Sequence, residues 1–408
     1  MARILFLAHR IPYPPNKGDK IRSWHFLEHL AASHDVHLGF YIDDPQDEKH
    51  VAFLKGQVKS LCFESVSKSQ QKLMALRGLV TGKPLTLSAY PKAKLKRYAE
   101  KLITAGEIDI IFLFSGATMQ LVEGVGNIPV VADLVDVDSA KWATYAGAKP
   151  WPLSWLYRRE AKVLAAYELE ITLGSAVTLF VSDDEATLFK KELDIALHPK
   201  VYGVPNGVNL VHFDPERFRQ TRADGEEPPL KVIFTGAMDY APNLEAAEWF
   251  VHKVWPKVKA ECPEAEFIIA GGPKTPEVAA LERTSGVKAL GYVDDMAETI
   301  AEADVVVAPL LTARGIQNKV LEGMAMAKPV LATPAAHEGI AATAGEQLVV
   351  AAEANKFSEA LTVLLRDRVR REAVGAAARQ FVEDHHSWQS CLSKLDDIIS
   401  RVLGARSL

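Results

Sequence analysis

The sequence contains only three cysteines in 408 residues, and they lie far apart, at Cys62, Cys262 and Cys391. Such sparse thiols lack metal-ligand spacing, so we expect them to be small buried side chains in a reducing compartment. The chain also lacks any run near the roughly 20 apolar residues of a membrane span. Residues 1–8 are too short for a signal-peptide core. We therefore expect a cytoplasmic protein, either soluble or associated with the inner face of the cytoplasmic membrane.

A surplus of positive charge is also missing, because 47 Lys and Arg face 52 Asp and Glu and the formal net charge is −5. This balance argues against a nucleic-acid-binding protein, although it leaves room for local basic patches. The hydrophobic content of 48% is normal for a globular protein with a substantial core. A chain of this length is too long for one ordinary domain, so we expect two.

Short apolar runs alternate with helical patterns through the first half of the chain. The runs expected as strands are residues 3–8, 36–41, 108–114, 130–134 and 178–182. The expected helices are residues 20–32, 91–105 and 153–173. This alternation favours a doubly wound parallel sheet.

An Asn-Gly turn at residues 206–207 leads into the polar, proline-rich residues 214–229, which mark the domain boundary. A second α/β pattern then begins, with strands expected at residues 230–235, 266–270, 287–290, 304–308 and 329–333. The chain ends in an amphipathic helix that docks its apolar face on a neighbour. The expected parts are residues 1–205 (first domain), 206–229 (linker), 230–385 (second domain) and 386–408 (final helix). The predicted architecture is two α/β sheets with a cleft between them.

The segment 313–330 is the most informative stretch, because it combines a tight turn at Gly315, a short helix and a strand. The start of such a helix offers backbone N–H groups and a positive dipole end that suit a diphosphate. Lys319 and Glu322 are three residues apart and share one helical face. The lysine can neutralise phosphate while the glutamate accepts hydrogen bonds from a ribose diol. The alternative is a surface ion pair, for which lysine before glutamate is the poorer order.

Each of the other candidates has a structural alternative. Gly18 follows the first strand without a G-x-G-x-x-G pattern, so a dinucleotide site is not expected, and a plain turn residue is the alternative to the role that the resemblance below implies. His9, at the end of that strand, is either a catalytic base or a structural histidine. Asp136 and Asp138 form a D-x-D pair, for which metal binding is less favoured than polarisation of an acceptor hydroxyl by Asp133 or Asp136.

Candidates in the second half follow the strand ends. Asn243 either faces the cleft or caps its helix. Gly272 either approaches the nucleotide or makes a strand-end turn. Tyr292 and Val293 either bracket a base or belong to the edge of the core.

Several motifs together resemble the GT-B glycosyltransferases of family 4. They are residues 204–208, 234–243, 291–294 and 315–329. In the first half, residues 14–22 and 136–142 are similar to the bacterial sugar transferases of exosortase (PEP-CTERM) exopolysaccharide clusters. The resemblance spans nearly the whole chain.

The resemblance implies two Rossmann-like doubly wound domains facing a central cleft, an acceptor-binding one first and a nucleotide-sugar-binding one second, with the last helix crossing back. It implies transfer of a sugar from a UDP- or GDP-type donor, with retention and without a metal, to a glycan or lipid-linked acceptor. The implied donor-binding residues are Gly18, Gly236, Asn243, Gly272, Tyr292, Val293, Gly315, Ile316, Gln317, Asn318, Lys319 and Glu322. The implied catalytic residues are Lys319, Arg314, Asp136 and His9.

One departure concerns Arg314, which stands where family members usually carry the first of two glutamates. Arginine there can bind phosphate bidentately or recognise a carboxylated sugar. Two alternatives stay open: a non-hydrolysing nucleotide-sugar epimerase, which needs carboxylates and a histidine placed for proton transfer, and an inactive nucleotide-sugar-binding protein.

A last feature is the density of basic residues between Lys83 and Lys101, and the mixture of aromatic and basic residues around Trp151 and Arg158. Ordinary solvated helix faces are the commoner explanation. The alternative is contact with anionic membrane lipids.

Overall fold

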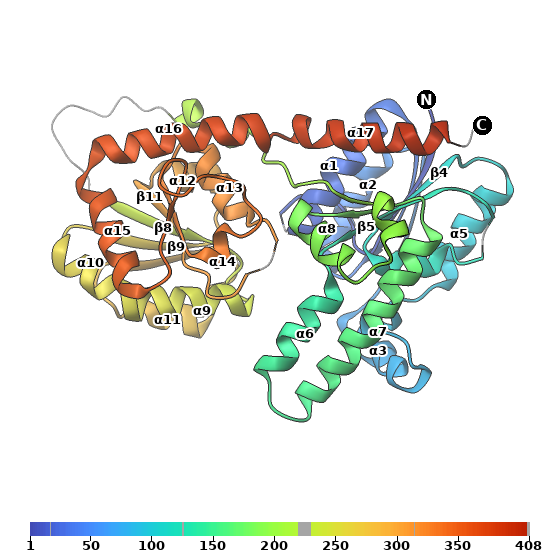
Figure 1. Ribbon diagram of the computed structural model, residues 1–408, viewed down its shortest axis with the longest axis horizontal. Coiled ribbons are helices and arrows are strands. Elements are labelled where there is room, and N and C mark those ends of the chain that lie inside the picture. The colour runs from blue at the N-terminus through green and yellow to red at the C-terminus, as the bar shows by residue number, and fades with distance from the viewer. Residues whose placement is uncertain (17, 125, 219–229, 314, 406–408) are drawn as a thin grey trace. The chain divides into compact units, whose positions relative to one another are not determined.

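The computed structural model describes residues 1–408 except 17, 125, 219–229, 314 and 406–408 (Figure 1). The described part of the chain divides into two compact units, which we call unit 1 (residues 1–205 and 392–408) and unit 2 (residues 206–391). Residues 206–218, expected as part of a linker, belong to unit 2. There Val208 and Phe213 are buried in the core, and the N–H of Val208 donates to the carbonyl of His386 at 2.7 Å.

Within the described residues, unit 1 is built on a seven-stranded parallel sheet in the order β3-β2-β1-β4-β5-β6-β7. The strands are β1 (Arg3–Ala8), β2 (Asp35–Ile42), β3 (Ser60–Ser65), β4 (Ile110–Phe114), β5 (Val130–Val135), β6 (Val177–Phe180) and β7 (Val201–Gly203). The α-helices are α1 (Gly18–Ser33), α2 (Val51–Lys55), α3 (Lys68–Thr81), α4 (Leu85–Ser88), α5 (Ala93–Thr104), α6 (Asp138–Ala148), α7 (Leu153–Gly174) and α8 (Asp183–Lys190). Short 3-10 turns are η1 (Pro45–His50), η2 (Gly116–Leu121) and η3 (Ile195–Lys200).

Unit 2, over the residues that the structure describes, has a six-stranded parallel sheet in the order β10-β9-β8-β11-β12-β13. The strands are β8 (Lys231–Thr235), β9 (Glu266–Ala270), β10 (Val287–Gly291), β11 (Val305–Ala308), β12 (Val330–Ala332) and β13 (Val349–Val350). The α-helices are α9 (Ala241–Trp249), α10 (Trp255–Glu261), α11 (Pro276–Leu281), α12 (Met296–Ala301), α13 (Asn318–Ala325), α14 (Pro334–His337), α15 (Ala354–Arg366) and α16 (Arg368–His385). A 3-10 turn, η4 (Pro215–Phe218), and a π-helical turn, η5 (Phe250–Val254), complete the unit.

The final helix, α17 (Trp388–Gly404), begins in unit 2 and belongs to unit 1 from Leu392 onward. Its residues Leu395, Ile399 and Val402 are buried, as the amphipathic spacing predicts.

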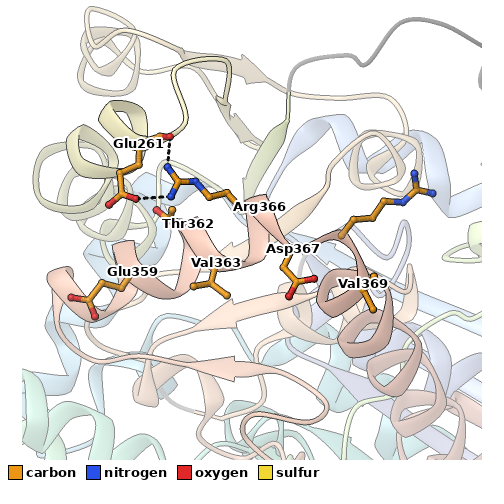
Figure 2. A pocket seen from close by; sticks show the side chains of 8 residues that line it. Glu261, Glu359, Thr362, Val363, Arg366, Asp367 and Val369 are labelled. Carbon is orange, nitrogen blue, oxygen red and sulfur yellow. Dashed lines mark hydrogen bonds and ion pairs between the residues drawn. The ribbon is translucent and has the colours of Figure 1, made fainter.

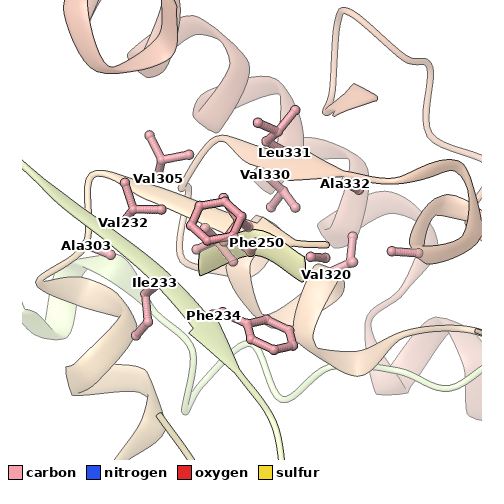
Figure 3. Close-up of a cluster of buried hydrophobic side chains, with 14 of the residues drawn as sticks. Val232, Ile233, Phe234, Phe250, Ala303, Val305, Val320, Val330, Leu331 and Ala332 are labelled. Carbon is pink, nitrogen blue, oxygen red and sulfur yellow. The ribbon is translucent and has the colours of Figure 1, made fainter. Parts of the chain in front are cut away.

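The central strands of both sheets are apolar on both faces, which is typical of parallel sheets whose two faces are covered by helices. In unit 2, β8 and β11 read KVIFT and VVVA, and Figure 3 shows Val232 and Val305 close to Phe250 of the helical layer. Unit 1 repeats this design around Leu5, whose strand is buried beyond its first residue. The prediction of two α/β parallel-sheet domains is confirmed.

None of the helices in the described part of the chain combines the length and the hydropathy required to cross a bilayer.

Candidate functional site

In unit 2 the sheet order places the topological switch point between β8 and β11. From β8 the chain first builds outward to β9 and β10, and then returns to the other side of β8 with β11, β12 and β13. The loops that leave β8 and β11 therefore diverge at the carboxyl edge of the sheet, where open α/β sheets bind their ligands. The candidate residues Gly236 and Asn243 follow β8, and the segment 315–322 follows β11.

Glycines bring the loops after β8 and β9 into backbone contact. A Cβ at Gly271 would lie 2.7 Å from the carbonyl oxygen of Gly236, and one at Gly272 would lie 2.6 Å from the nitrogen of Met238. A Cβ at Gly236 would lie 2.8 Å from Nδ2 of Asn243 and 3.2 Å from Nζ of Lys319. Because Gly271 and Gly272 meet backbone atoms closer than any Cβ contact allows, glycine is required at these two positions for the loops to approach each other.

Lys319 lies on the first turn of α13 and reaches the loop that follows β8. Its Nζ donates to Oδ1 of Asn243 at 2.5 Å and lies 5.0 Å from the ring centroid of Phe234. Asn243 in turn donates from Nδ2 to the carbonyl of Ala237 at 2.9 Å. The amide of Asn243 is thus oriented by the β8 loop, and it holds the ammonium group at the switch point.

The electrostatics of the site centre on Lys319 and Glu322, one turn apart on α13. Burial lowers the pKa of Lys319 to about 8, opposed by the nearby charge of Glu322. Burial raises the pKa of Glu322 to about 7, opposed by Lys319. Burial in the free site therefore disfavours the charged form of each side chain. An anion bound beside Lys319 would stabilise the charged lysine and offset part of this penalty.

Two further polar atoms in this region are buried and, within the described structure, have no hydrogen-bond partner: Oγ1 of Thr235 and Oδ1 of Asn318. Thr235 ends β8 and adjoins Gly236, while Asn318 begins α13 and adjoins Lys319. Buried polar atoms are rarely left unsatisfied, so both oxygens are available to a polar partner. Thr235 was not among the candidates predicted from the sequence, although its position at the end of the expected strand 230–235 was the available signal.

The remaining candidates of unit 2 surround this centre or lie outside the described residues. Gly315 has φ 65°, and its carbonyl accepts from Nε2 of Gln317 at 3.2 Å. Gln317 is the N-cap residue of α13, but its side chain accepts no capping hydrogen bond from the helix. Ile316 is buried in the core. Arg314 lies outside the described residues.

At the end of β10, Gly291 has φ 74° and its carbonyl accepts from the N–H of Gly271 at 2.8 Å. Tyr292 is 78% exposed and Val293 is half-buried against the core. The exposed ring of Tyr292 is not an edge aromatic of the core.

Residues 229–367 match the family model described as "Glycosyl transferases group 1". Unit 2 contains a group 1 glycosyltransferase domain. The GDP-mannose-dependent monoacylated alpha-(1-6)-phosphatidylinositol monomannoside mannosyltransferase of Corynebacterium glutamicum is 29% identical over 247 residues. That alignment spans 56% of this chain and 63% of the relative. An uncharacterized 44.6 kDa protein in the cps region of Klebsiella pneumoniae is 21% identical, over 97% of this chain and 99% of that protein.

The whole chain also resembles solved structures. Alr3699/HepE of Anabaena, crystallised with UDP and glucose, superimposes with a TM-score of 0.69 at 14% identity, over 98% of this chain and 100% of that one. The fold is GT-B.

In unit 1 the switch point lies between β1 and β4, and His9 follows β1 there. Its ring stacks on Phe114 with centroids 5.8 Å apart, its Nε2 lies 3.6 Å from Oδ2 of Asp19, and its Nδ1 is buried without a hydrogen-bond partner in the described structure. Burial opposes ionisation of Asp19, but His9 and Arg10 outweigh it and hold the pKa of that carboxyl well below its usual value. Gly18, the first residue of α1, is exposed, and a Cβ there would meet nothing within 4 Å.

Asp136 lies at the carboxyl edge of β5 in a strongly constrained turn. Val135 before it has φ 71°, which is rare for a β-branched residue. The turn is held because Val137 N–H donates to Glu185 at 2.8 Å and the Ser139 hydroxyl donates to Glu168 at 2.5 Å. Strained backbone conformations of this kind cluster at functional sites. By contrast, the neighbouring Asp133 is fully buried in an ion pair with Arg22, so it is structural.

A surface pocket of about 650 Å³ lies elsewhere on unit 2, between α10, α15 and the start of α16 (Figure 2). An ion pair between Arg366 and Glu261 crosses it at 3.2 Å. Because α10 leads into the first residue of β9, this pocket lies near the edge opposite the switch point of the glycosyltransferase domain. No candidate site residue lines it.

Within the described residues no group of three or more His, Cys, Asp or Glu side chains is placed to hold a metal ion.

Proposed function

We propose that this protein is a retaining glycosyltransferase that moves a sugar from a nucleotide-sugar donor to a hydroxyl acceptor. The observation that carries the proposal is the ammonium of Lys319, held by Asn243 at the switch point of a group 1 glycosyltransferase domain. Asn318, next to Lys319 in the sequence, and Thr235, next to Gly236 at the end of β8, have buried side-chain oxygens without a hydrogen-bond partner in the described structure.

The donor diphosphate would lie against Lys319 and the start of α13, where fixed positive charge and backbone dipoles stabilise the leaving group. Glu322 would accept hydrogen bonds from the ribose hydroxyls, and Tyr292 and Val293 would bracket the base. Gly236, Gly272 and Gly315 would let the backbone approach the phosphates. Arg314 would contact the phosphate or the donor sugar.

In the transfer itself, the bond between the anomeric carbon and the phosphate oxygen breaks, and the nucleoside diphosphate leaves with the electron pair. The acceptor oxygen forms its bond on the same face, and its proton passes to the leaving phosphate oxygen. This route needs no protein nucleophile and no metal, because Lys319 and the helix dipole supply the positive charge. In unit 1, Asp136 and His9 would orient and polarise the acceptor hydroxyl, and Gly18 would admit the donor.

The donor is proposed to be of the UDP or GDP type. The mannosyltransferase relative is named for GDP-mannose, and the Anabaena structure holds UDP. We propose a lipid-linked glycan as acceptor and a role in exopolysaccharide synthesis, which are supported by the lipid acceptor in the relative's name and by the cps-region relative.

The test is a two-stage experiment with the full chain. Thermal unfolding is first followed with UDP, GDP and their sugar conjugates, in the wild type, Lys319→Met and the matched control Lys356→Met, whose lysine is exposed on α15. We expect a donor-induced stabilisation that the Lys319 variant loses and the control keeps. If every nucleotide sugar leaves the wild-type midpoint unchanged, the proposal is wrong.

The preferred donor is then incubated with acceptors, and the product is examined by NMR. Transfer with the donor's anomeric configuration supports the proposal. Release of a free epimer would assign the protein to the epimerases, and binding without turnover would make it an inactive relative. Retained turnover after exhaustive chelation is expected, because no step uses a metal.

A further inference from the structure

Unit 1 exposes large apolar side chains on α3 and around the start of α7. On α3 they include Leu73, 67% exposed, and Val80, 90% exposed. At the turn before α7, Trp151 is 80% exposed. We call this the basic–apolar surface; its apolar members are Leu73, Leu76, Leu79, Val80, Trp151, Leu153 and Trp155. An exposed apolar patch of this kind marks an interaction site.

The two parts of the surface are joined by direct contacts. Nη2 of Arg159, on α7, donates to the carbonyl of Gly78 at 2.6 Å and to that of Lys83 at 3.1 Å. Trp155 precedes Arg159 by one helical turn, so its ring lies near the level where α3 meets α7. Figure 1 shows α3 beside the lower part of α7. A single surface therefore carries the leucines of α3 and Trp155 of α7, and Trp151 lies in the turn just before that helix.

The charge of this surface has one sign. Residues 65–99 contain eight Lys and Arg and no Asp or Glu, in a chain whose net charge is −5. Four of these cations lie on or next to α3 and are exposed: Lys68, Lys72, Arg77 and Lys83. Lys149 and Arg158, also exposed, add positive charge near Trp151.

The basic residues of α5 do not belong to this surface. Nζ of Lys94 lies 5.3 Å from the ring centroid of Phe63, and Lys96 donates to the carbonyl of Glu123 at 3.2 Å. Figure 1 places α5 well away from α3. The basic segment 83–101 is thus divided: Lys83 lies next to α3, whereas Lys94 and Lys96 of α5 face Phe63 and Glu123.

We propose that the basic–apolar surface docks the protein on a bilayer that contains anionic phospholipid. Exposed leucines and tryptophans enter the headgroup boundary, while lysine and arginine stems extend to the phosphates. Uniform positive charge selects anionic lipid. The positive charge also argues against dimerisation through this surface, because two such surfaces would repel each other. This inference does not depend on the proposed transfer chemistry.

The test uses the full-length protein in co-sedimentation with vesicles of phosphatidylcholine alone and of phosphatidylcholine with equal parts of phosphatidylglycerol. The wild type is expected to bind the anionic vesicles at least about tenfold more tightly, with a loss of binding at high salt. Lys72→Glu with Arg77→Glu removes the charge, and Leu76→Ser with Val80→Ser removes the apolar part. Each pair is expected to weaken binding about tenfold or more. The control Arg97→Glu with Lys101→Glu, exposed on α5, makes the same charge change and is expected to have less than a twofold effect.

Absence of binding to anionic vesicles, or equal loss in the α5 control, would overturn the proposal. A wild-type dimer in light scattering that disappears in Leu76→Ser with Val80→Ser would assign the surface to a second copy instead. Thermal unfolding is used to check that each variant folds. The donor-induced shift of the unfolding midpoint, measured in the same samples, tests the proposed transfer site independently of membrane binding.

Discussion

Replacing Lys319 by methionine is expected to stabilise the free protein while abolishing donor binding. Methionine keeps an unbranched stem beside Phe234 and removes the charge. Burial lowers the lysine pKa from 10.5 to about 8. At about 1.4 kcal/mol per pH unit, holding the ammonium charged costs about 3 kcal/mol. Loss of the hydrogen bond to Asn243 removes about 1 kcal/mol of that gain, and partial exposure of the lysine reduces it further. The net stabilisation expected near pH 7 is roughly 1–2 kcal/mol.

The sign of this effect depends on pH. The folded pKa of Lys319 is below the unfolded value, so the unfolded chain binds more protons between about pH 8 and 10.5. The stability of the wild type therefore rises through that window. The advantage of Lys319→Met is complete below pH 8 and disappears as the pH approaches 10.5.

The assay is thermal unfolding of the wild type, Lys319→Met and the control Lys356→Met, with and without the preferred nucleotide. For a unit of this size, 1 kcal/mol corresponds to about 2–4 °C, so the free variant is expected to melt roughly 2–8 °C higher. Nucleotide should raise the wild-type and control midpoints and leave the variant unchanged. A free variant that melts below the wild type, or one that keeps the nucleotide shift, would refute the reasoning.

Three further outcomes are expected. Glu322→Gln should weaken the binding of a nucleotide about tenfold in calorimetry, because the variant loses hydrogen bonds to the ribose hydroxyls. The affinity for the corresponding 2′-deoxy nucleotide should change little, and equal losses of affinity for the two nucleotides would contradict this. The nucleotide affinity of the wild type should fall roughly tenfold per pH unit above about pH 8, whereas the affinity of Lys319→Arg should not change with pH, because arginine remains charged. The same pH dependence of affinity in both proteins would exclude the lysine as the titrating group. Arg22→Met should cost about 3–5 kcal/mol by leaving the fully buried Asp133 unpaired, and Arg22→Met with Asp133→Leu should recover much of it; an unchanged melting temperature in the single variant would be the contrary result.

Much of the fold is predictable from local pattern. The expected strands at residues 3–8 and 266–270 coincide with β1 and β9, because continuous apolar runs bounded by polar turns mark buried parallel strands. The sequence analysis missed β3, β7 and β13. β7 and β13 have three and two residues, and most of β3 is only half-buried. Such strands carry no run long enough to distinguish them, and their pairing is decided by the neighbouring strand.

The candidate site is predictable only where it is contiguous. Gly315, Lys319 and Glu322 lie within eight residues, so a turn and one helical face are enough to group them. The hydrogen bond from Lys319 to Asn243 joins residues 76 positions apart, and no local pattern contains it. Asn243 could cap its helix or face the site, and its side chain instead bonds to the β8 loop and to the lysine. Only the sheet order, with β11 beside β8, brings the two together.

The carboxyl edge of the sheet carries a free-energy cost in each unit, but the physical origin of that cost differs. In unit 2 it is electrostatic, since burial disfavours the charged states of both Lys319 and Glu322. In unit 1 it is conformational, since Val135 adopts a backbone state that β-branched residues avoid. A ligand can offset the first cost by bringing opposite charge, but it cannot offset the second, which the buried Glu185 and Glu168 maintain. Unit 2 should therefore gain stability on binding a charged co-substrate, whereas the Asp136 turn should be equally rigid with and without one. Hydrogen exchange of the two edges, with and without nucleotide, would distinguish these behaviours.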